Sequence, residues 1–95
     1  MVKIIARISS KAEMATQLRQ ILKDLVGPSC NEPGCLSYEL FQDEENPLEF
    51  ITIEHWADRE AADRHLATAH VAEAIGKAGS LLAQAPIIHR FAPVV

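Results

Sequence analysis

Two kinds of hydrophobic periodicity alternate along this chain, and their order limits the folds that it can adopt. Apolar residues recur at every second position over residues 2–9, 35–42 and 50–56, as in strands, and residues 86–91 form a last apolar stretch of this kind. Residues 10–26 and 58–75 instead carry apolar residues at helical spacing. The order strand, helix, strand, strand, helix, strand predicts a ferredoxin-like α+β fold, an antiparallel βαββαβ sheet with helices on one face.

Capping signals place the expected ends of the helices. The segment Ser10-Lys11-Ala12-Glu13 has the form of a capping box, which predicts that the first helix begins there, and Gly27-Pro28 predicts its end. Asp58 is expected to cap the second helical region, and Thr68 to start a second helical piece within it. The glycines expected to end that piece are Gly76 and Gly79.

Length and composition are those of one globular domain. The 95 residues predict a single domain over residues 1–95, and a hydrophobic share of 48% with 23% charged residues is typical of a folded chain. No apolar run approaches the roughly 18 residues of a membrane span, and no long apolar region of a signal peptide follows Met1. We therefore expect a cytoplasmic protein with no membrane partner.

The charge of the chain is acidic and unevenly distributed. Thirteen acidic and nine basic residues give a net charge of -4, and residues 32–63 hold ten acids with Arg59 as their only base. Binding to nucleic acid needs a basic face, so this pattern argues against a nucleic-acid partner. The run Asp43-Glu44-Glu45 is expected to lie at the solvated tip of a hairpin.

Both faces of the predicted sheet carry apolar side chains, although two helices can cover only one of them. On the first strand, Ile4 and Ile8 share one face while Ile5 lies on the other. A domain of this size buries only about 60% of its surface alone. We therefore expect an obligate homodimer, a dimeric α/β barrel in which the open sheet faces stack.

A cluster of polar residues is the strongest candidate for chemistry. No phosphate-binding loop, HExxH, GxSxG or paired CxxC motif occurs, which argues against the usual NTPase, zinc protease and hydrolase assignments. Cys30 and Cys35 have no companion pair, so we expect reduced thiols rather than zinc ligands. Polar residues instead gather near the predicted sheet-helix layer, as in a small-molecule site. They are Tyr38, Glu54, Trp56, His65 and His70.

These residues also have structural interpretations. Trp56 fits a hydrophobic core, and His65 fits a buried helix face where hydrogen bonds satisfy it. Burial of an unpaired carboxylate is costly, so Glu54 needs a partner, either a backbone amide or His65. His70 follows His65 by five residues, about 140° around an unbroken helix, so the pair lacks metal-ligand spacing and no metal site is expected.

Residues 50–71 resemble a known family signature. The runs Ile53-Glu54-His55-Trp56, Glu60-Ala61 and His65-Leu66-Ala67-Thr68-Ala69-His70 are similar to the E-x-W…H-L-x-T-x-H pattern of antibiotic biosynthesis monooxygenase (ABM) domains, the quinol monooxygenases among them. Gly34-Cys35-Leu36-x-Tyr38 and Pro47 fit the same pattern. The resemblance covers nearly the whole chain, and it is more specific for the fold than for the reaction, because this scaffold carries several activities.

The resemblance implies a dimeric domain that oxidises a quinol or related polyphenol with molecular oxygen, without a metal, flavin or other cofactor. Such a reaction needs a base for the phenol, a group that stabilises the anion and a dry pocket for the ring. His65 is the expected base, because an ordinary imidazole has a pKa of about 6.5. Glu54 is expected to orient it. The residues expected to hold the ring and its oxyanion are Trp56, Tyr38, His70 and Arg90.

Other activities on the same scaffold provide alternatives. Haem-degrading relatives use an asparagine on the first strand and a haem-ligating histidine in the second helical region. Here residues 2–9 contain no asparagine and the ligand position falls near Ile75 or Gly76, so haem chemistry is not expected. Two other functions stay open: an isomerase that moves protons on a small hydroxyketone with His65 and Glu54, and a dimeric small-ligand binding or stress-response module without catalysis.

Overall fold

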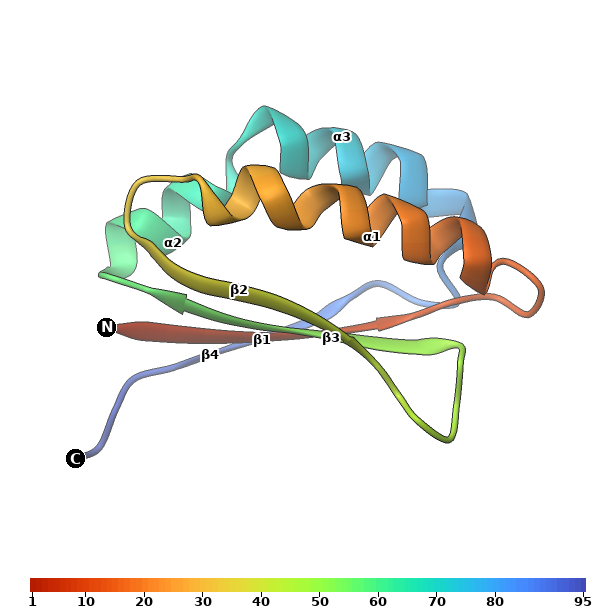
Figure 1. Ribbon diagram of the computed structural model, residues 1–95, viewed down its shortest axis with the longest axis horizontal. Coiled ribbons are helices and arrows are strands. Elements are labelled where there is room, and N and C mark those ends of the chain that lie inside the picture. The colour runs from red at the N-terminus through yellow and green to blue at the C-terminus, as the bar shows by residue number, and fades with distance from the viewer.

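Four strands form one antiparallel sheet, and all the helices lie on one side of it (Figure 1). The computed structural model describes residues 1–95. The strand order is β2-β3-β1-β4, and each neighbouring pair is antiparallel, which confirms the predicted ferredoxin-like fold. In chain order the elements are β1 (Val2–Ser9), α1 (Ala15–Cys30), β2 (Cys35–Gln42), β3 (Glu49–Trp56), α2 (Arg59–Leu66), α3 (Ala69–Ala78), a short 3-10 helix (Gly79–Leu81) and β4 (Ile87–Phe91).

Strand β3 shows the alternation that the sequence predicts. Its burial alternates strictly between buried and half-buried positions along all of its length. Phe50, Thr52, Glu54 and Trp56 are buried beneath the helices, and Phe50 and Trp56 are the largest fully buried side chains of the protein. Burial of an aromatic side chain of this size contributes roughly 2 to 3 kcal/mol, so these positions fix which face of the sheet turns toward the helices.

The predicted start of the first helix is wrong. Ser10 does not cap a helix, because its backbone N–H donates to the Leu48 carbonyl at 2.8 Å and the residue pairs with Leu82 in an isolated β-bridge. The chain then turns through Glu13, which has a φ of 70°, and α1 begins at Ala15 without a side-chain cap. The sheet hydrogen bonds of Ser10 therefore outcompete the capping box.

The predicted end of this helix is also wrong, since α1 continues through Pro28 to Cys30. A proline inside a helix leaves one carbonyl without its backbone donor, here that of Asp24. Asp24 and Pro28 are both exposed, so water can satisfy that carbonyl and the ring meets no packed neighbour. The ladder resumes directly, with the Asn31 N–H donating to the Gly27 carbonyl at 3.2 Å.

The second helical region is divided where the sequence indicates. Asp58 caps α2 by accepting a hydrogen bond from the Ala61 N–H at 2.8 Å, and the Thr68 hydroxyl accepts one from the Val71 N–H at 3.4 Å at the start of α3. Both predicted caps are confirmed. Of the two glycines expected to end α3, Gly79 is the C-cap, which confirms that prediction. The expected stop at Gly76 is wrong, because α3 runs through this exposed glycine to Ala78, whose side chain is buried in the core.

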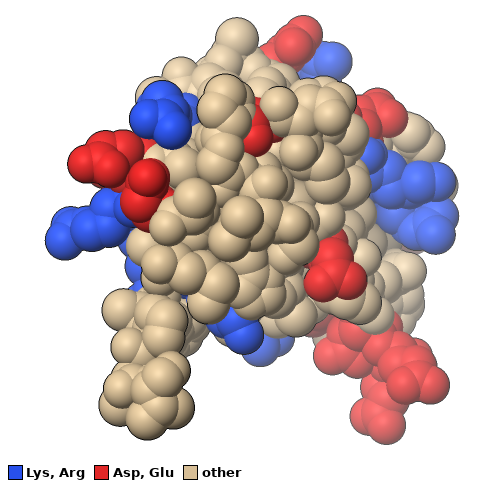
Figure 2. Space-filling model, turned by 60° about the vertical axis from the view of Figure 1, so that its left-hand side comes forward, with Lys and Arg blue, Asp and Glu red and all other residues tan.

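The acidic run at residues 43–45 lies in the β2–β3 turn and is exposed, as predicted. Asp43 organises this turn, since its Oδ1 accepts hydrogen bonds from the backbone N–H groups of Glu45 and Asn46 at 2.8 and 3.1 Å. Figure 2 shows one face of the molecule, on which charged side chains surround a broad uncharged centre. None of the helices combines the length and the hydrophobicity needed to cross a membrane.

Gly34 is the position where the fold has least tolerance for a side chain. Its φ is 83°, and a Cβ atom placed on it would lie 2.6 Å from the Cβ of Ala61 on α2. Its carbonyl also accepts a hydrogen bond from the Ala57 N–H at 2.7 Å, which joins the β2 entry to the end of β3. The turn before β2 therefore sets how closely α2 approaches the sheet.

We predict that Gly34→Ala lowers the free energy of unfolding by about 2 to 4 kcal/mol, from left-handed strain together with the clash at Ala61. Urea denaturation followed by the fluorescence of the single tryptophan measures the change. The matched control is Gly76→Ala, which adds a methyl to an exposed helical position with no atom within 4 Å and should raise stability by about 0.5 to 1 kcal/mol. Equal effects of the two substitutions would contradict this account.

Candidate functional site

A cavity of about 220 Å³ lies between the sheet and the helical layer. It takes wall residues from all three α-helices and all four strands, and most of them are apolar. Its polar groups come from four residues, Tyr38, Thr52, Glu54 and His65. A larger hollow of about 460 Å³ beside β2 is a surface groove that includes Arg19 and Lys23. Only the inner cavity combines apolar walls with convergent buried polar groups, as small-molecule sites do.

Glu54 is held on the cavity wall by neighbours on its own strand. The Thr52 hydroxyl donates to Glu54 Oε2 at 2.8 Å, and the Trp56 indole N–H donates to Glu54 Oε1 at 3.0 Å. These three residues point to the same face of β3 because side chains two positions apart on a strand share a face. The carboxylate is only 4% exposed, so both donors replace the water that it loses on burial.

His65, from the last turn of α2, lies over this carboxylate. Its Nδ1 is 2.6 Å from Glu32 Oε2, whereas its Nε2 is 3.7 Å from Glu54 Oε1, beyond hydrogen-bond distance. A neutral imidazole beside the Glu32 carboxylate carries its hydrogen on Nδ1, so we assign the lone pair to Nε2. Glu54 therefore faces His65 without a hydrogen bond to it. Glu32 orients it instead.

Trp56 packs its indole ring against the imidazole of His65. The two ring centroids are 4.6 Å apart with an interplanar angle of 32°, and the indole is fully buried. Trp56 therefore contacts His65 and Glu54 but does not line the cavity. Because its N–H is already bonded to Glu54, the indole fixes the position of both groups.

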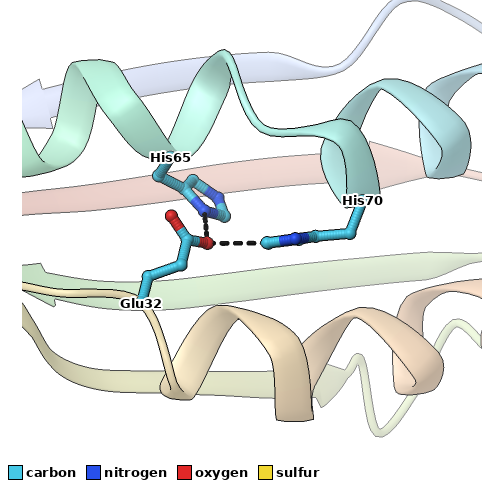
Figure 3. A group of neighbouring side chains, drawn as sticks. All are labelled: Glu32, His65 and His70. Carbon is cyan, nitrogen blue, oxygen red and sulfur yellow. Dashed lines mark hydrogen bonds and ion pairs between the residues drawn. The ribbon is translucent and has the colours of Figure 1, made fainter.

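His70 joins the same carboxylate from the first turn of α3. Its Nε2 is 2.8 Å from Glu32 Oε2, and the ring centroids of His65 and His70 are 6.2 Å apart (Figure 3). The expected 140° separation of the two imidazoles is wrong. It assumes a continuous helix, whereas the helix is interrupted at Ala67 and Thr68. One candidate ligand atom from each of Glu32, His65 and His70 lies within 4.8 Å of the others, so these residues form a group that can hold a metal ion.

Most of the residues that the sequence selects lie close together in the structure, but only some of them line the cavity. Tyr38, Glu54 and His65 line the cavity. His70 is turned toward the surface, where its side chain is 28% exposed, and Arg90 on β4 binds Asp63 at 2.7 Å outside the cavity. Neither of these two lines the cavity, so the structure does not place them against the expected oxyanion.

Glu32 is the functional residue that the sequence reasoning missed. It lies in the turn between the end of α1 and Gly34, in the half of the chain that is rich in acids. Hydrophobic periodicity gives no information about Glu32, because the pattern repeats along helices and strands and not through a turn. Its place before Pro33-Gly34 is the one available signal, since that turn directs the residue before it back under α2.

A sequence model of the antibiotic biosynthesis monooxygenase family matches residues 1–77, which include Glu32, the whole of β3 and both histidines of the site. The chain belongs to this family.

Solved structures agree with the membership in the ABM family. The crystal structure of an antibiotic biosynthesis monooxygenase has 33% identity and a TM-score of 0.93, with all of both chains covered. A Pseudomonas aeruginosa protein has 33% identity and a TM-score of 0.92 over 99% of this chain and 94% of its own. A Mycobacterium tuberculosis protein has 28% identity and a TM-score of 0.92 over 99% and 95%.

A curated relative is longer than this ABM domain. The match to an uncharacterised protein of Synechocystis has 31% identity over 81 residues, which are 85% of this chain. The chain spans about half of that relative, 55% of its length. The remainder of the Synechocystis protein has no counterpart in the match.

Tyr38 is the group of this ABM site whose acidity departs most from its ordinary value. Burial in the cavity wall, and next the negative charge of Glu54, raise the pKa of the Tyr38 hydroxyl well above its usual value near 10. The hydroxyl therefore stays protonated over the whole physiological range.

We predict that Tyr38 does not ionise near pH 10 while the protein is folded. Its pKa is higher in the folded than in the unfolded chain, so its contribution to stability is complete below about pH 10 and is lost as the pH rises further. Tyr38 is the only tyrosine, so near-ultraviolet phenolate absorbance reports it alone. The absorbance should appear together with alkaline unfolding, and urea-unfolded protein should show it near pH 10. Ionisation near pH 10 with unchanged circular dichroism would contradict this.

Proposed function

We propose that this protein is a cofactor-independent monooxygenase that oxidises a quinol or related phenolic compound with molecular oxygen. The observation that carries the proposal is the imidazole of His65, which lines an apolar cavity while Glu32 occupies its Nδ1. Membership in the ABM family supports an oxygenase reaction, and the cavity chemistry supports an aromatic substrate.

The cavity volume favours a small substrate. An engineered apolar protein cavity of about 150 Å³ stays dry and binds benzene, so about 220 Å³ accommodates one substituted ring rather than a fused polycycle. Leu22, Val71 and Ile88 offer apolar surface to its faces, and the cavity also has polar groups, those of Thr52, Glu54 and His65, for an oxygen substituent. A monocyclic quinol matches both features.

The first chemical step is removal of a phenolic proton. Phenols have a pKa of about 10, so the quinol needs a base and an environment that stabilises the anion. His65 Nε2 accepts the proton, and the resulting imidazolium lies between the carboxylates of Glu32 and Glu54, at 2.6 and 3.7 Å. Two flanking carboxylates stabilise the cation that forms, as in other base and carboxylate pairs.

The electron-rich quinolate then reduces oxygen. A ring carbon forms a bond to one oxygen atom, with the electrons supplied by the ring, and the resulting hydroperoxide loses water to leave a new carbonyl. In total one quinol and one O₂ give one hydroxyquinone and one water. His65 returns its proton to the departing oxygen, and the apolar walls keep bulk water away from the intermediate.

We predict oxygen uptake with monocyclic quinols, measured with an oxygen electrode. His65→Ala should lower the rate about 10²- to 10⁴-fold, because it removes the base. Glu32→Gln should lower it by a smaller factor, since the imidazole keeps its place but loses the carboxylate that stabilises the imidazolium. His89→Gln is the matched control, because this exposed histidine on β4 does not line the cavity.

The same assay distinguishes the other functions considered for this scaffold. Absence of uptake with every quinol contradicts the oxygenase proposal. Tight binding of aromatics without uptake would instead support a ligand-binding module, and proton exchange on a small hydroxyketone would support an isomerase. A full rate in His65→Ala would leave the reaction standing and overturn only the assignment of the base.

A homodimer also belongs to this proposal, because one face of the sheet carries no helix (Figure 1). Ile5, Ile51 and Ile53 lie at the centre of that face, and Phe41 and Phe91 lie toward its edges with 44% and 49% of their surface exposed. Lys3, Arg7 and Glu39 share this face with them, and exposed apolar side chains on an open sheet face favour a covering partner. Face-to-face stacking of two sheets with two-fold symmetry would cover it.

We predict that sedimentation velocity gives the mass of two chains at micromolar concentration. Ile53→Asp should shift the protein to the mass of one chain, because it places a charge at the centre of the interface. Ala72→Asp adds the same charge to an exposed position on α3 and should leave the dimer unchanged. A monomeric wild-type protein would contradict the prediction.

A further inference from the structure

We propose that Glu32, His65 and His70 form a binding site for a divalent transition-metal ion. This inference goes beyond the proposed oxidation, which needs no metal, and it differs from the expectation drawn from the sequence. The three residues come from three different segments, the turn after α1, the end of α2 and the start of α3, and their side chains converge on one point (Figure 3).

The donor set selects the class of ion. Two imidazole nitrogens and one carboxylate oxygen are ligands that suit Zn²⁺, Fe²⁺, Co²⁺ or Ni²⁺, whereas Mg²⁺ and Ca²⁺ prefer oxygen ligands alone. The same combination of two histidines and one carboxylate leaves positions open for water or another ligand. The predicted ligand is therefore a first-row transition-metal ion.

The Glu32 carboxylate already lies close to both imidazoles. Glu32 Oε2 is 2.6 Å from His65 Nδ1 and 2.8 Å from His70 Nε2. An ion about 2.1 Å from two ligands at a right angle separates those ligands by about 3.0 Å. Both contacts fall on the same oxygen, so an ion there replaces two bridging hydrogens. The two ring nitrogens lie within 4.8 Å of each other, and binding one ion requires them to come to about 3.0 to 3.4 Å. His70, which is partly exposed on the first turn of α3, can move toward the ion.

The surroundings of His65 match those of a metal-binding histidine. In metal sites the second ring nitrogen is commonly directed at a carboxylate that orients the ring. Here the Nε2 of His65 faces Glu54 at 3.7 Å, and Glu54 is itself fixed by Thr52 and Trp56. A small rotation of the imidazole closes this distance. The site thus has a second layer of support already in place.

An ion can reach the site from the surface between α1 and α3. His70 borders a surface depression there together with Asp24 and Glu73, whose carboxylates attract cations, and with Lys77. Neither cysteine belongs to this group of ligand atoms, and burial raises the pKa of the Cys35 thiol to about 11, which disfavours the thiolate form that binds metals. The imidazoles and Glu32 are therefore the preferred ligands.

Binding of an ion has a consequence for the proposed oxidation. A metal on Nδ1 requires the lone pair of that nitrogen, so the hydrogen moves to Nε2, the nitrogen assigned as the base. The ion would then inhibit oxygen uptake. This consequence rests on the proposed function, whereas the binding itself does not.

Isothermal titration calorimetry of chelator-treated protein with ZnCl₂ tests the site without any substrate. We expect one Zn²⁺ per chain and a loss of affinity of at least about 100-fold in Glu32→Gln and in His70→Ala, since even outer-layer changes cost 10- to 100-fold. His89→Gln and Cys30→Ser should retain wild-type affinity, which excludes surface histidines and the more exposed thiol. Thermal melts confirm that each variant is folded.

Two spectroscopic readouts locate the ion. Trp56 is the only tryptophan and its ring lies 4.6 Å from that of His65, so its fluorescence should change with Zn²⁺ and saturate at the same stoichiometry. Co²⁺ should show visible absorption bands that Glu32→Gln lacks. Wild-type affinity in both Glu32→Gln and His70→Ala, or no binding to wild type, would overturn the proposal. Zn²⁺ binding in the absence of quinol oxidation would leave this site intact and contradict only the proposed function.

Discussion

The burial of two carboxylates, Glu54 beneath the helices and Glu32 against the ends of α2 and α3, is the constraint on which the rest of this structure depends. An ionised carboxylate removed from water costs several kcal/mol unless hydrogen-bond donors replace its hydration. Glu54 receives its donors from Thr52 and Trp56 on the same strand, and Glu32 receives its donors from two histidines. Each carboxylate thus fixes the groups around it. The polar part of the cavity wall lies at Glu54 and His65, where the hydrogen bonds of the buried carboxylates are satisfied. The rest of the wall is apolar and can exclude water.

The interruption between α2 and α3 is the local feature that assembles the site. A continuous helix would direct His65 and His70 to different sides, whereas the break at Ala67 and Thr68 lets both rings face Glu32. The Thr68 hydroxyl donates to the His65 carbonyl at 2.7 Å and accepts from the Val71 N–H, so one side chain ends the first helix and begins the second. Thr68 therefore sets the relative position of the two imidazoles through the backbone, because its hydrogen bonds are to main-chain atoms.

The same arrangement serves both proposals because His65 has two distinct nitrogens. With Glu32 on Nδ1, the Nε2 atom would be the base for a bound phenol. With an ion on Nδ1, the Nε2 atom carries a hydrogen and becomes a donor. The choice between these states lies at Glu32 and His70, on the surface side of the ring, while the substrate would lie on the other side.

The sequence by itself determined the order of the strands and helices, the inward face of β3 and the caps at Asp58 and Thr68, because periodicity and capping act between residues that are near in the chain. It also selected Tyr38, Glu54 and His65. Only the tertiary structure decided that Ser10 joins the sheet, that α1 passes through Pro28, and that Glu32 orients His65. Those outcomes depend on partners far along the chain, such as Leu48 for Ser10 and His65 for Glu32, and no local pattern encodes the energy of a contact that forms only when distant segments pack.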